Sequence, residues 1–244
     1  MRRQRALGPL RAVIWDYDGT LVDTRRRNRS ATRRILERIT GRSPAAFPGV
    51  RTQRAYDELN RAAPNWRALY RDAFGLAESQ IDEAGRLWSE VQATDDTPAR
   101  IFAGIRETVD DLCRLPQGIV SQNGRAIIER SLRQEGLLHR FQSIVGYEEV
   151  PFQRQKPDPL GLLLTIERLT TEPCGTVAYV GDHETDAVSA ARANEELARG
   201  GSGLRVVAIG AFFLGADDEA WAVRPDRRAR SPREVTRIVR ELMA

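Results

Sequence analysis

The stretch AVIWDYDGTLVDT, residues 12–24, begins as an apolar run and then changes abruptly to acidic residues. The run ends at Asp16, a second aspartate follows at position 18, and Gly19 comes next. A buried strand that ends in carboxylates places them at the edge of its sheet, where open α/β folds bind their ligands. If the strand continues through Asp18, both aspartates lie on one face. Because Asp-Gly is also common turn sequence, the stretch alone is compatible with a plain turn.

Similar short apolar runs recur along the chain and predict further buried strands. They lie at residues 118–121, 143–147, 176–180 and 204–210, with a weaker candidate at 221–223. The runs are continuous rather than alternating, which is typical of parallel strands buried on both faces. Helices are expected between them, at 101–115, 124–135, 159–169, 184–198 and 231–243. This alternation predicts a doubly wound, mainly parallel, Rossmann-like α/β sheet.

Residues 24–97 break this alternation, because they contain helical patterns and no strand-like run. Four helices are expected, around 33–39, 54–63, 65–74 and 77–91, with Pro64 at the start of the third. The sequence therefore predicts two domains: an α/β core formed by residues 1–23 and 98–244, and an inserted all-α domain formed by residues 24–97.

The composition bounds the class of protein. The chain has 244 residues, of which 41% are hydrophobic and 30% charged, and its mean hydropathy is −0.46. No run approaches the roughly 20 apolar residues that a membrane helix needs, no secretory leader is recognisable, and two cysteines do not make a disulfide framework. We therefore expect a cytoplasmic protein with no membrane partner, and no oligomeric state follows from the sequence.

The basic residues are unusual in kind. Of the 38 basic residues one is a lysine, Lys156, and all the others are arginines, yet the net charge is only +4 beside 34 acidic residues. No basic motif is interleaved with aromatic residues, so we do not expect a nucleic-acid partner. The lysine that this arginine-rich chain retains lies in QKPDP, residues 155–159.

Oxygen-bearing side chains follow three of the predicted strands, namely Asp16, Ser121 and Asp182. Asp186 comes four residues after Asp182 and therefore lies near it on the first turn of the next helix. Two unit charges about 4 Å apart repel by roughly 4 kcal/mol at an effective dielectric of 20, so such a cluster needs a cation. Carboxylate ligands suit Mg²⁺, and the chain has no Cys/His spacing for zinc.

Four motifs in this chain resemble, in order, those of the haloacid dehalogenase (HAD) superfamily. DYDGTLV, residues 16–22, is similar to the first motif, D-x-D-G-T-L/V, and Ser121 in IVSQNG matches the strand-ending Ser or Thr of the second. Lys156 matches the lysine of the third motif, and Asp182 and Asp186 in VGDHETD match the fourth, G-D-x-x-x-D. The helical insertion resembles the cap of the phosphoglycolate-phosphatase-like branch.

The resemblance implies a Mg²⁺-dependent phosphatase that hydrolyses a small phosphomonoester through an aspartyl phosphate. Asp16 would be the nucleophile and Asp18 the general acid and then the base. The groups that hold the phosphate would be Ser121, Lys156, Gly19, Thr20, Gln122 and Asn123. Mg²⁺ would be bound by Asp16, the backbone carbonyl of Asp18 and Asp182, while Asp186 would bind it through water or orient Lys156.

Other residues are weaker candidates or stay open. Arg25, Arg26 and Asn28 are weak candidates for substrate contact because they lie nearest the first motif, whereas most arginines of this helix are expected to form a solvated face. His183 and Glu184 depart from the small polar residues usual in the fourth motif. For His183, substrate contact and a helix start are both open.

Several alternative functions remain at this stage. A phosphosugar mutase of the same superfamily is one, and an arginine-rich nucleic-acid-binding module or a regulatory module is another. Asp18 argues against a dehalogenase, and a phosphonate-cleaving relative would need a cap lysine, which residues 24–97 lack. Every catalytic position is filled, which argues against a purely regulatory role. The physiological substrate cannot be inferred from the cap sequence.

Overall fold

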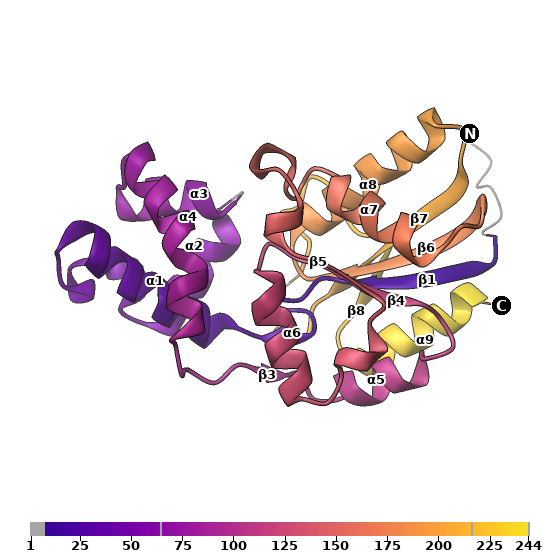
Figure 1. Ribbon diagram of the computed structural model, residues 1–244, viewed down its shortest axis with the longest axis horizontal. Coiled ribbons are helices and arrows are strands. Elements are labelled where there is room, and N and C mark those ends of the chain that lie inside the picture. Colours follow the sequence, from indigo (N-terminus) through magenta and orange to yellow (C-terminus); the bar gives the residue numbers. More distant parts are fainter. Residues whose placement is uncertain (1–7, 64, 216, 244) are drawn as a thin grey trace. The chain divides into compact units, whose positions relative to one another are not determined.

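The computed structural model describes residues 8–63, 65–215 and 217–243, and the chain divides into two compact units (Figure 1). Met1–Val22 and Ile101–Ala244 form the first, which we call the α/β unit, and Asp23–Arg100 form the second, the helical unit. The chain passes between them at β2 (Val22–Asp23) and β3 (Arg100–Ile101), which pair in a two-stranded sheet.

The α/β unit is built on a six-stranded sheet in the order β5-β4-β1-β6-β7-β8, with every described pair parallel. The strands are β1 (Leu10–Trp15), β4 (Gln117–Val120), β5 (Ser143–Val145), β6 (Cys174–Gly181), β7 (Gly203–Ala211) and β8 (Arg227–Ala229). In the register of the central strand β1, Val13 lies opposite Gln117 on one side and Ala178 on the other. Because residues 12–15 of β1 are all buried, both faces of this strand lie in the interior.

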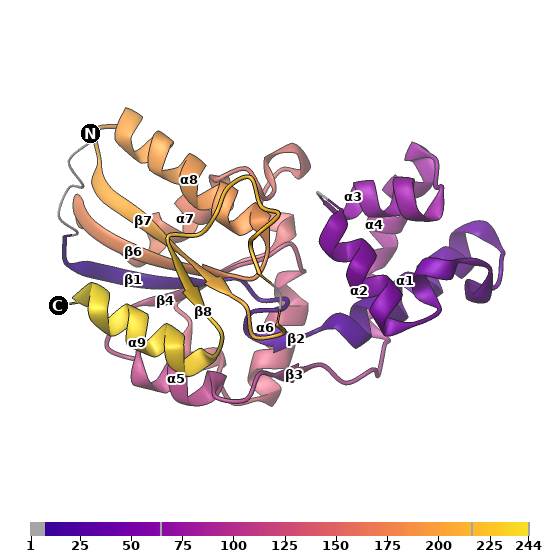
Figure 2. The same ribbon diagram turned by 180° about the vertical axis from the view of Figure 1, so that it is seen from behind.

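Helices cover both faces of this sheet. They are α5 (Ile105–Asp111), α6 (Arg125–Gln134), α7 (Leu160–Leu169), α8 (Glu184–Arg199) and α9 (Pro232–Met243). The two ribbon views place α7 and α8 on one face and α5 and α9 on the other (Figures 1 and 2). On the first of these faces, Ile14 of β1 shares an apolar cluster with Leu162 of α7 and Ala190 of α8. The predicted doubly wound α/β fold is confirmed.

Two sequence-based predictions for the α/β unit are wrong in detail. Residues 221–223 do not form the sixth strand, because the backbone N–H groups of Ala222 and Val223 donate to the Glu184 carboxylate and Trp221 packs against the ring of Phe212. The sixth strand is β8 instead. The helix expected over residues 101–115 begins only at Ile105, after a glycine with φ of +91° and after the short strand β3.

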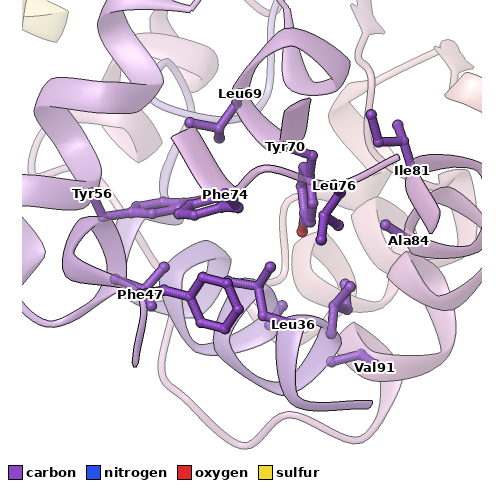
Figure 3. Packing of buried hydrophobic residues seen from close by; sticks show 13 residues of the cluster. Leu36, Phe47, Tyr56, Leu69, Tyr70, Phe74, Leu76, Ile81, Ala84 and Val91 are labelled. Carbon is purple, nitrogen blue, oxygen red and sulfur yellow. The ribbon is translucent and has the colours of Figure 1, made fainter. Parts of the chain in front are cut away.

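The helical unit is helical as predicted and has a core of its own. Its helices are α1 (Arg25–Thr40), α2 (Gln53–Ala62), α3 (Trp66–Ala68), which continues as a π-helix over Leu69–Ala73, and α4 (Glu78–Ala93). Aliphatic and aromatic residues share this core, where Phe74 meets Phe47 and Tyr70 in edge-to-face contacts with ring centroids 6.3 and 5.7 Å apart (Figure 3). Pro64, expected to begin the third helix, lies outside the described residues.

None of the helices in the described ranges combines the length and the apolar composition that a bilayer-spanning helix requires.

Candidate active site

The predicted site residues of the α/β unit follow the carboxyl ends of adjacent parallel strands. Asp16 comes directly after β1, Ser121 after β4 and Asp182 after β6. The backbone N–H of Asp16 donates to the carbonyl of Val180 at 2.8 Å, so the first residue after β1 is still held against β6. Since these strands are neighbours in the sheet, their ends bring the three side chains to one edge.

Lys156 lies between two of the aspartates. Its Nζ is 2.6 Å from Oδ1 of Asp16 and 2.8 Å from Oδ1 of Asp186, and the lysine is 8% exposed. Burial by itself lowers the pKa of Lys156, but the charges of Asp16 and Asp186 raise it well above its ordinary value. The lysine therefore carries its charge at neutral pH and bridges the two carboxylates.

A single lysine does not neutralise the acidic cluster around it. Asp16, Asp182 and Asp186 each offer a carboxylate oxygen, and these oxygens lie within 4.8 Å of one another. Burial raises the pKa of Asp16 from 3.8 to about 7, with Asp186 and Asp18 adding to the rise against the effect of Lys156. Burial and then the charge of Asp16 raise the pKa of Asp182 as well. This excess of negative charge on an all-oxygen donor set fits a hard divalent cation such as Mg²⁺.

The carboxylate of Asp18 belongs to a second group of polar side chains. Oγ of Ser121 and Nδ2 of Asn123 lie 3.4 and 3.3 Å from Oδ2 of Asp18. Ser121 Oγ also accepts the backbone N–H of Asn123 at 3.0 Å, which fixes the loop after β4. The side chain of Gln122 contacts the segment around Lys156 instead, since its Nε2 donates to the backbone carbonyl of Lys156 at 3.2 Å. The structure thus brings Asp18, Ser121 and Asn123 together beside the acidic cluster.

Gly19 is required at its position for a reason that the sequence did not indicate. Its φ is +80°, and a Cβ on this residue would lie 2.1 Å from Oδ2 of Asp182. The absence of a side chain therefore makes room for the Asp182 carboxylate, in addition to allowing the turn. Thr20 beside it is fully buried, and its Oγ1 has no hydrogen-bond partner in the described part of the chain.

His183 and Glu184 both make structural contacts, and substrate contact by His183 stays a prediction. Nδ1 of His183 accepts the backbone N–H of Thr185 at 3.3 Å and caps α8, and burial lowers the pKa of His183. Glu184 accepts the backbone N–H groups of Ala222 and Val223 at 2.6 and 3.1 Å. The carboxylate of Glu184 therefore holds the chain segment before β8.

Two residues of β6 contribute to the site and were missed by the sequence analysis. The hydroxyl of Tyr179 donates to Oδ1 of Asp186 at 2.8 Å, and its ring centroid lies 5.4 Å from Nζ of Lys156. A Cβ on Gly181 would lie 2.3 Å from Oδ2 of Asp186. The available signal was the hydroxyl of a tyrosine within an otherwise apolar strand, because a buried hydroxyl usually finds a polar partner.

Replacing Tyr179 by phenylalanine is expected to weaken activation by Mg²⁺ while leaving the fold intact. The change removes the hydroxyl that orients Asp186, and groups that orient metal ligands typically contribute at least about tenfold to metal affinity. For the Mg²⁺-dependent phosphatase proposed below, the Mg²⁺ concentration for half-maximal activity should rise by about that factor. Tyr56→Phe is the matched control, because Tyr56 is a buried tyrosine of the helical unit whose hydroxyl bonds to Thr32. Equal Mg²⁺ requirements in the wild type and Tyr179→Phe would contradict the positioning role.

The three weaker candidates lie in the first turn of α1, in the helical unit. Arg25 forms a bidentate pair with Asp23, with N···O distances of 2.9 and 2.7 Å, and lies 3.7 Å from Asp57. Asn28 donates to Thr24 at 3.2 Å and accepts from Gln92 at 3.2 Å, and Arg26 is exposed. Their contact with a substrate stays a prediction.

Comparison with known proteins agrees with the motifs and the fold. The sequence model of haloacid dehalogenase-like hydrolases matches residues 13–199. The chain belongs to this family. This HAD chain is 30% identical over 194 residues to the N-acetylmuramic acid 6-phosphate phosphatase of Pseudomonas aeruginosa, covering 78% of the chain and 79% of that relative.

One further relative agrees with the assignment to the HAD family, and a solved structure agrees with the fold. The phosphoglycolate phosphatase 1 of Pseudomonas aeruginosa is 28% identical over 189 residues, with 74% of this HAD chain and 65% of that protein covered. The chain thus spans less than two thirds of that relative's length. A crystal structure from Lactobacillus plantarum, assigned to phosphoglycolate phosphatase, superimposes with a TM-score of 0.72 at 24% identity, covering 94% of this chain and 99% of the other. Both Pseudomonas aeruginosa relatives are named as phosphatases, which are phosphoric monoester hydrolases.

Proposed function

We propose that this HAD-family chain is a Mg²⁺-dependent phosphatase that hydrolyses a small phosphomonoester through an aspartyl phosphate on Asp16. The observation that carries the proposal is the ion-pair geometry, in which Nζ of Lys156 lies 2.6 Å from Asp16 and 2.8 Å from Asp186 at the ends of β1 and β6. A buried cation beside a buried nucleophilic carboxylate provides a place for a phosphate group. The named relatives act on different phosphate esters, so the identity of the substrate is left to experiment.

The protein's own residues supply the nucleophile and the proton transfers. A carboxylate oxygen of Asp16 attacks phosphorus, and the ester oxygen leaves with a proton from Asp18. Asp18 then takes a proton from a water molecule, which attacks the aspartyl phosphate. This second step releases inorganic phosphate and restores Asp16. Ser121 and Asn123 lie within 3.4 Å of the Asp18 carboxylate and would hold it in place for these proton transfers.

The electrostatic requirement of this reaction is severe, because a phosphate dianion approaches a group of carboxylates. Lys156 offsets part of the repulsion, and hydrogen-bond donors of Ser121 and Asn123 would bind the phosphate oxygens. Asp16, Asp182 and the backbone carbonyl of Asp18 would hold Mg²⁺, with Asp186 binding it through water or orienting Lys156. When bound, Mg²⁺ would neutralise charge that develops on the transferring phosphoryl group. We place the enzyme in the cytoplasm and assign substrate selection to residues 24–97 as its cap domain.

The test is hydrolysis of an aryl phosphate, such as 4-nitrophenyl phosphate, by the purified full chain. Turnover should require Mg²⁺, cease in EDTA and recover when Mg²⁺ is added back. A panel of phosphomonoesters, including 2-phosphoglycolate and sugar phosphates, then ranks substrates by kcat/KM. Absence of metal-dependent turnover across the whole panel would overturn the proposed function.

The raised pKa of Asp16 predicts how the stability of the metal-free protein depends on pH. The folded state binds this proton up to about pH 7, whereas an unfolded aspartate releases it near pH 4. Protonation of Asp16 therefore contributes to the free energy of unfolding in full below about pH 4, and this contribution is lost as the pH rises through 7. The melting temperature in EDTA, taken relative to Asp16→Asn, should fall from pH 5 to pH 8. The stabilisation by Mg²⁺ should grow over the same range, and equal Mg²⁺ effects at both pH values would contradict this prediction.

A further inference from the structure

Arg27, in the first turn of α1, is a buried cation in the helical unit. It is 7% exposed, and it extends the buried stripe of α1 that continues at Ala31 and Ile35. Its Nε and Nη2 are both buried, and neither has a hydrogen-bond partner among residues 8–63, 65–215 and 217–243. No ion pair of Arg27 is found within those ranges either.

The two unpartnered nitrogens lie on the edge of a guanidinium that binds a carboxylate or phosphate with two parallel hydrogen bonds. This chain uses that edge elsewhere. Nε and Nη2 of Arg25 each donate to one carboxylate oxygen of Asp23, and Nε and Nη2 of Arg228 do the same to Asp218. In Arg27 the same edge is buried and meets no carboxylate among residues 8–63, 65–215 and 217–243.

Such an arrangement is unfavourable unless an anion completes it. An arginine side chain cannot lose its proton in a protein, and a buried charge without a partner is destabilising. The first turn of α1 contains no acidic residue, although the N-terminus of a helix favours negative charge.

We propose that Arg27 is the anchor of an oxyanion-binding site in the helical unit, which takes a carboxylate or a phosphate group on its Nε/Nη2 edge. The oxyanion has two possible sources, a second anionic group of the substrate or a free small anion. The first source rests on the phosphatase function proposed above, whereas the second does not. Both sources share the planar, bidentate recognition that this edge provides.

Calorimetric titration of the full chain in Mg²⁺ tests the proposal without requiring turnover. The first probe is 3-phosphonopropionate, a non-hydrolysable phosphonate that carries a carboxylate, and the second is 3-hydroxypropylphosphonate, in which a hydroxyl replaces it. Sodium malonate and inorganic phosphate serve as free anions. Each ligand is titrated into the wild type, Arg27→Gln and a control variant, Arg38→Gln. Arg38 lies in the same helix but is exposed and pairs with Glu90.

If the substrate supplies the oxyanion, the wild type and Arg38→Gln should bind the carboxylated phosphonate roughly ten to one hundred times more tightly than its neutral partner. Arg27→Gln should bind the two phosphonates equally. If a free anion is the ligand, malonate or phosphate should occupy one binding site in the wild type that Arg27→Gln does not have. The wild type should then bind the two phosphonates equally. The proposal is overturned if Arg27→Gln keeps both the wild-type preference for the carboxylated phosphonate and the wild-type binding of malonate and phosphate.

Thermal unfolding separates ligand binding from a structural role. Arg27→Met removes an unpaired buried charge, so the ligand-free variant should melt at a higher temperature than the wild type, by on the order of 2–4 °C. The anion that binds the wild type should raise its melting temperature but not that of the variant. A lower melting temperature for ligand-free Arg27→Met would show that Arg27 stabilises the fold itself and would contradict the proposal. If the wild type does not hydrolyse 4-nitrophenyl phosphate, the proposed phosphatase function is contradicted. The result for binding of a free anion to Arg27 is not affected.

Discussion

Asp16→Asn is expected to abolish phosphomonoester hydrolysis, with kcat reduced by a factor on the order of 10⁴ or more. The amide that replaces the carboxylate is a poor nucleophile, so no acyl phosphate can form. The residual rate should be measured with enzyme in excess of an aryl phosphate at saturating Mg²⁺. Labelled phosphate should become covalently attached to the wild type and not to the variant after an acid quench.

The fold of the Asp16→Asn variant should be preserved. The substitution removes one carboxylate from a cluster in which burial and neighbouring carboxylates already raise the pKa of Asp16 to about 7. Its metal-free form should therefore melt at no lower temperature than the wild type at pH 8. Asp96→Asn, a change at an exposed aspartate of the helical unit, is the matched control and should keep full activity. If kcat of Asp16→Asn stays within tenfold of the wild type, Asp16 is not the nucleophile.

Lys156→Met is expected to lower kcat/KM by on the order of 10²–10³. Methionine has a similar length but no charge, so the repulsion between the acidic cluster and an incoming phosphate is no longer offset. The same change leaves Asp16 and Asp186 without their buried cation, and breaking a buried ion pair in this way costs about 3–5 kcal/mol. Urea unfolding in EDTA should report this loss, and Mg²⁺ should restore part of it.

A second lysine variant and a neighbouring arginine sharpen this test. Lys156→Arg keeps the charge but replaces a compact ammonium by a planar guanidinium, so only partial recovery is expected. Arg154→Met is the control for a lost cation in the same segment, because Arg154 is half exposed and pairs with Asp158. A kcat/KM for Lys156→Met within threefold of the wild type would exclude an electrostatic role for this lysine.

Much of the fold was predictable because its signals are local. Continuous apolar runs identified five of the six strands of the main sheet, since strands buried on both faces need no polar positions. The sixth was misplaced because WAV, residues 221–223, resembles a strand end, whereas the true strand, RRA at 227–229, contains two arginines. The short strands β2 and β3 were missed because two residues carry no periodicity.

The site could be predicted only as a set of residue types. Motif order indicated Asp16, Lys156, Asp182 and Asp186, and the structure brings these side chains together. The hydrogen bond from Tyr179 to Asp186 was missed, because a tyrosine in a buried strand is also ordinary core packing. Arg27 was indistinguishable from its arginine neighbours in sequence, since burial and missing partners are properties of the folded chain.

The sequence by itself determined the chemistry that this chain can offer: carboxylates after two apolar strands, one lysine among many arginines, and an α/β alternation interrupted by helices. These features depend on residue type and on spacing within a few positions. Only the tertiary structure decided that Lys156 contacts Asp16 across 140 residues, because the strand order β5-β4-β1-β6-β7-β8 is selected by packing of both sheet faces. It also decided that Gly19 makes room for Asp182 and that Nε and Nη2 of Arg27 are buried without a partner in the described part of the chain, because both depend on atoms from segments far apart in the chain.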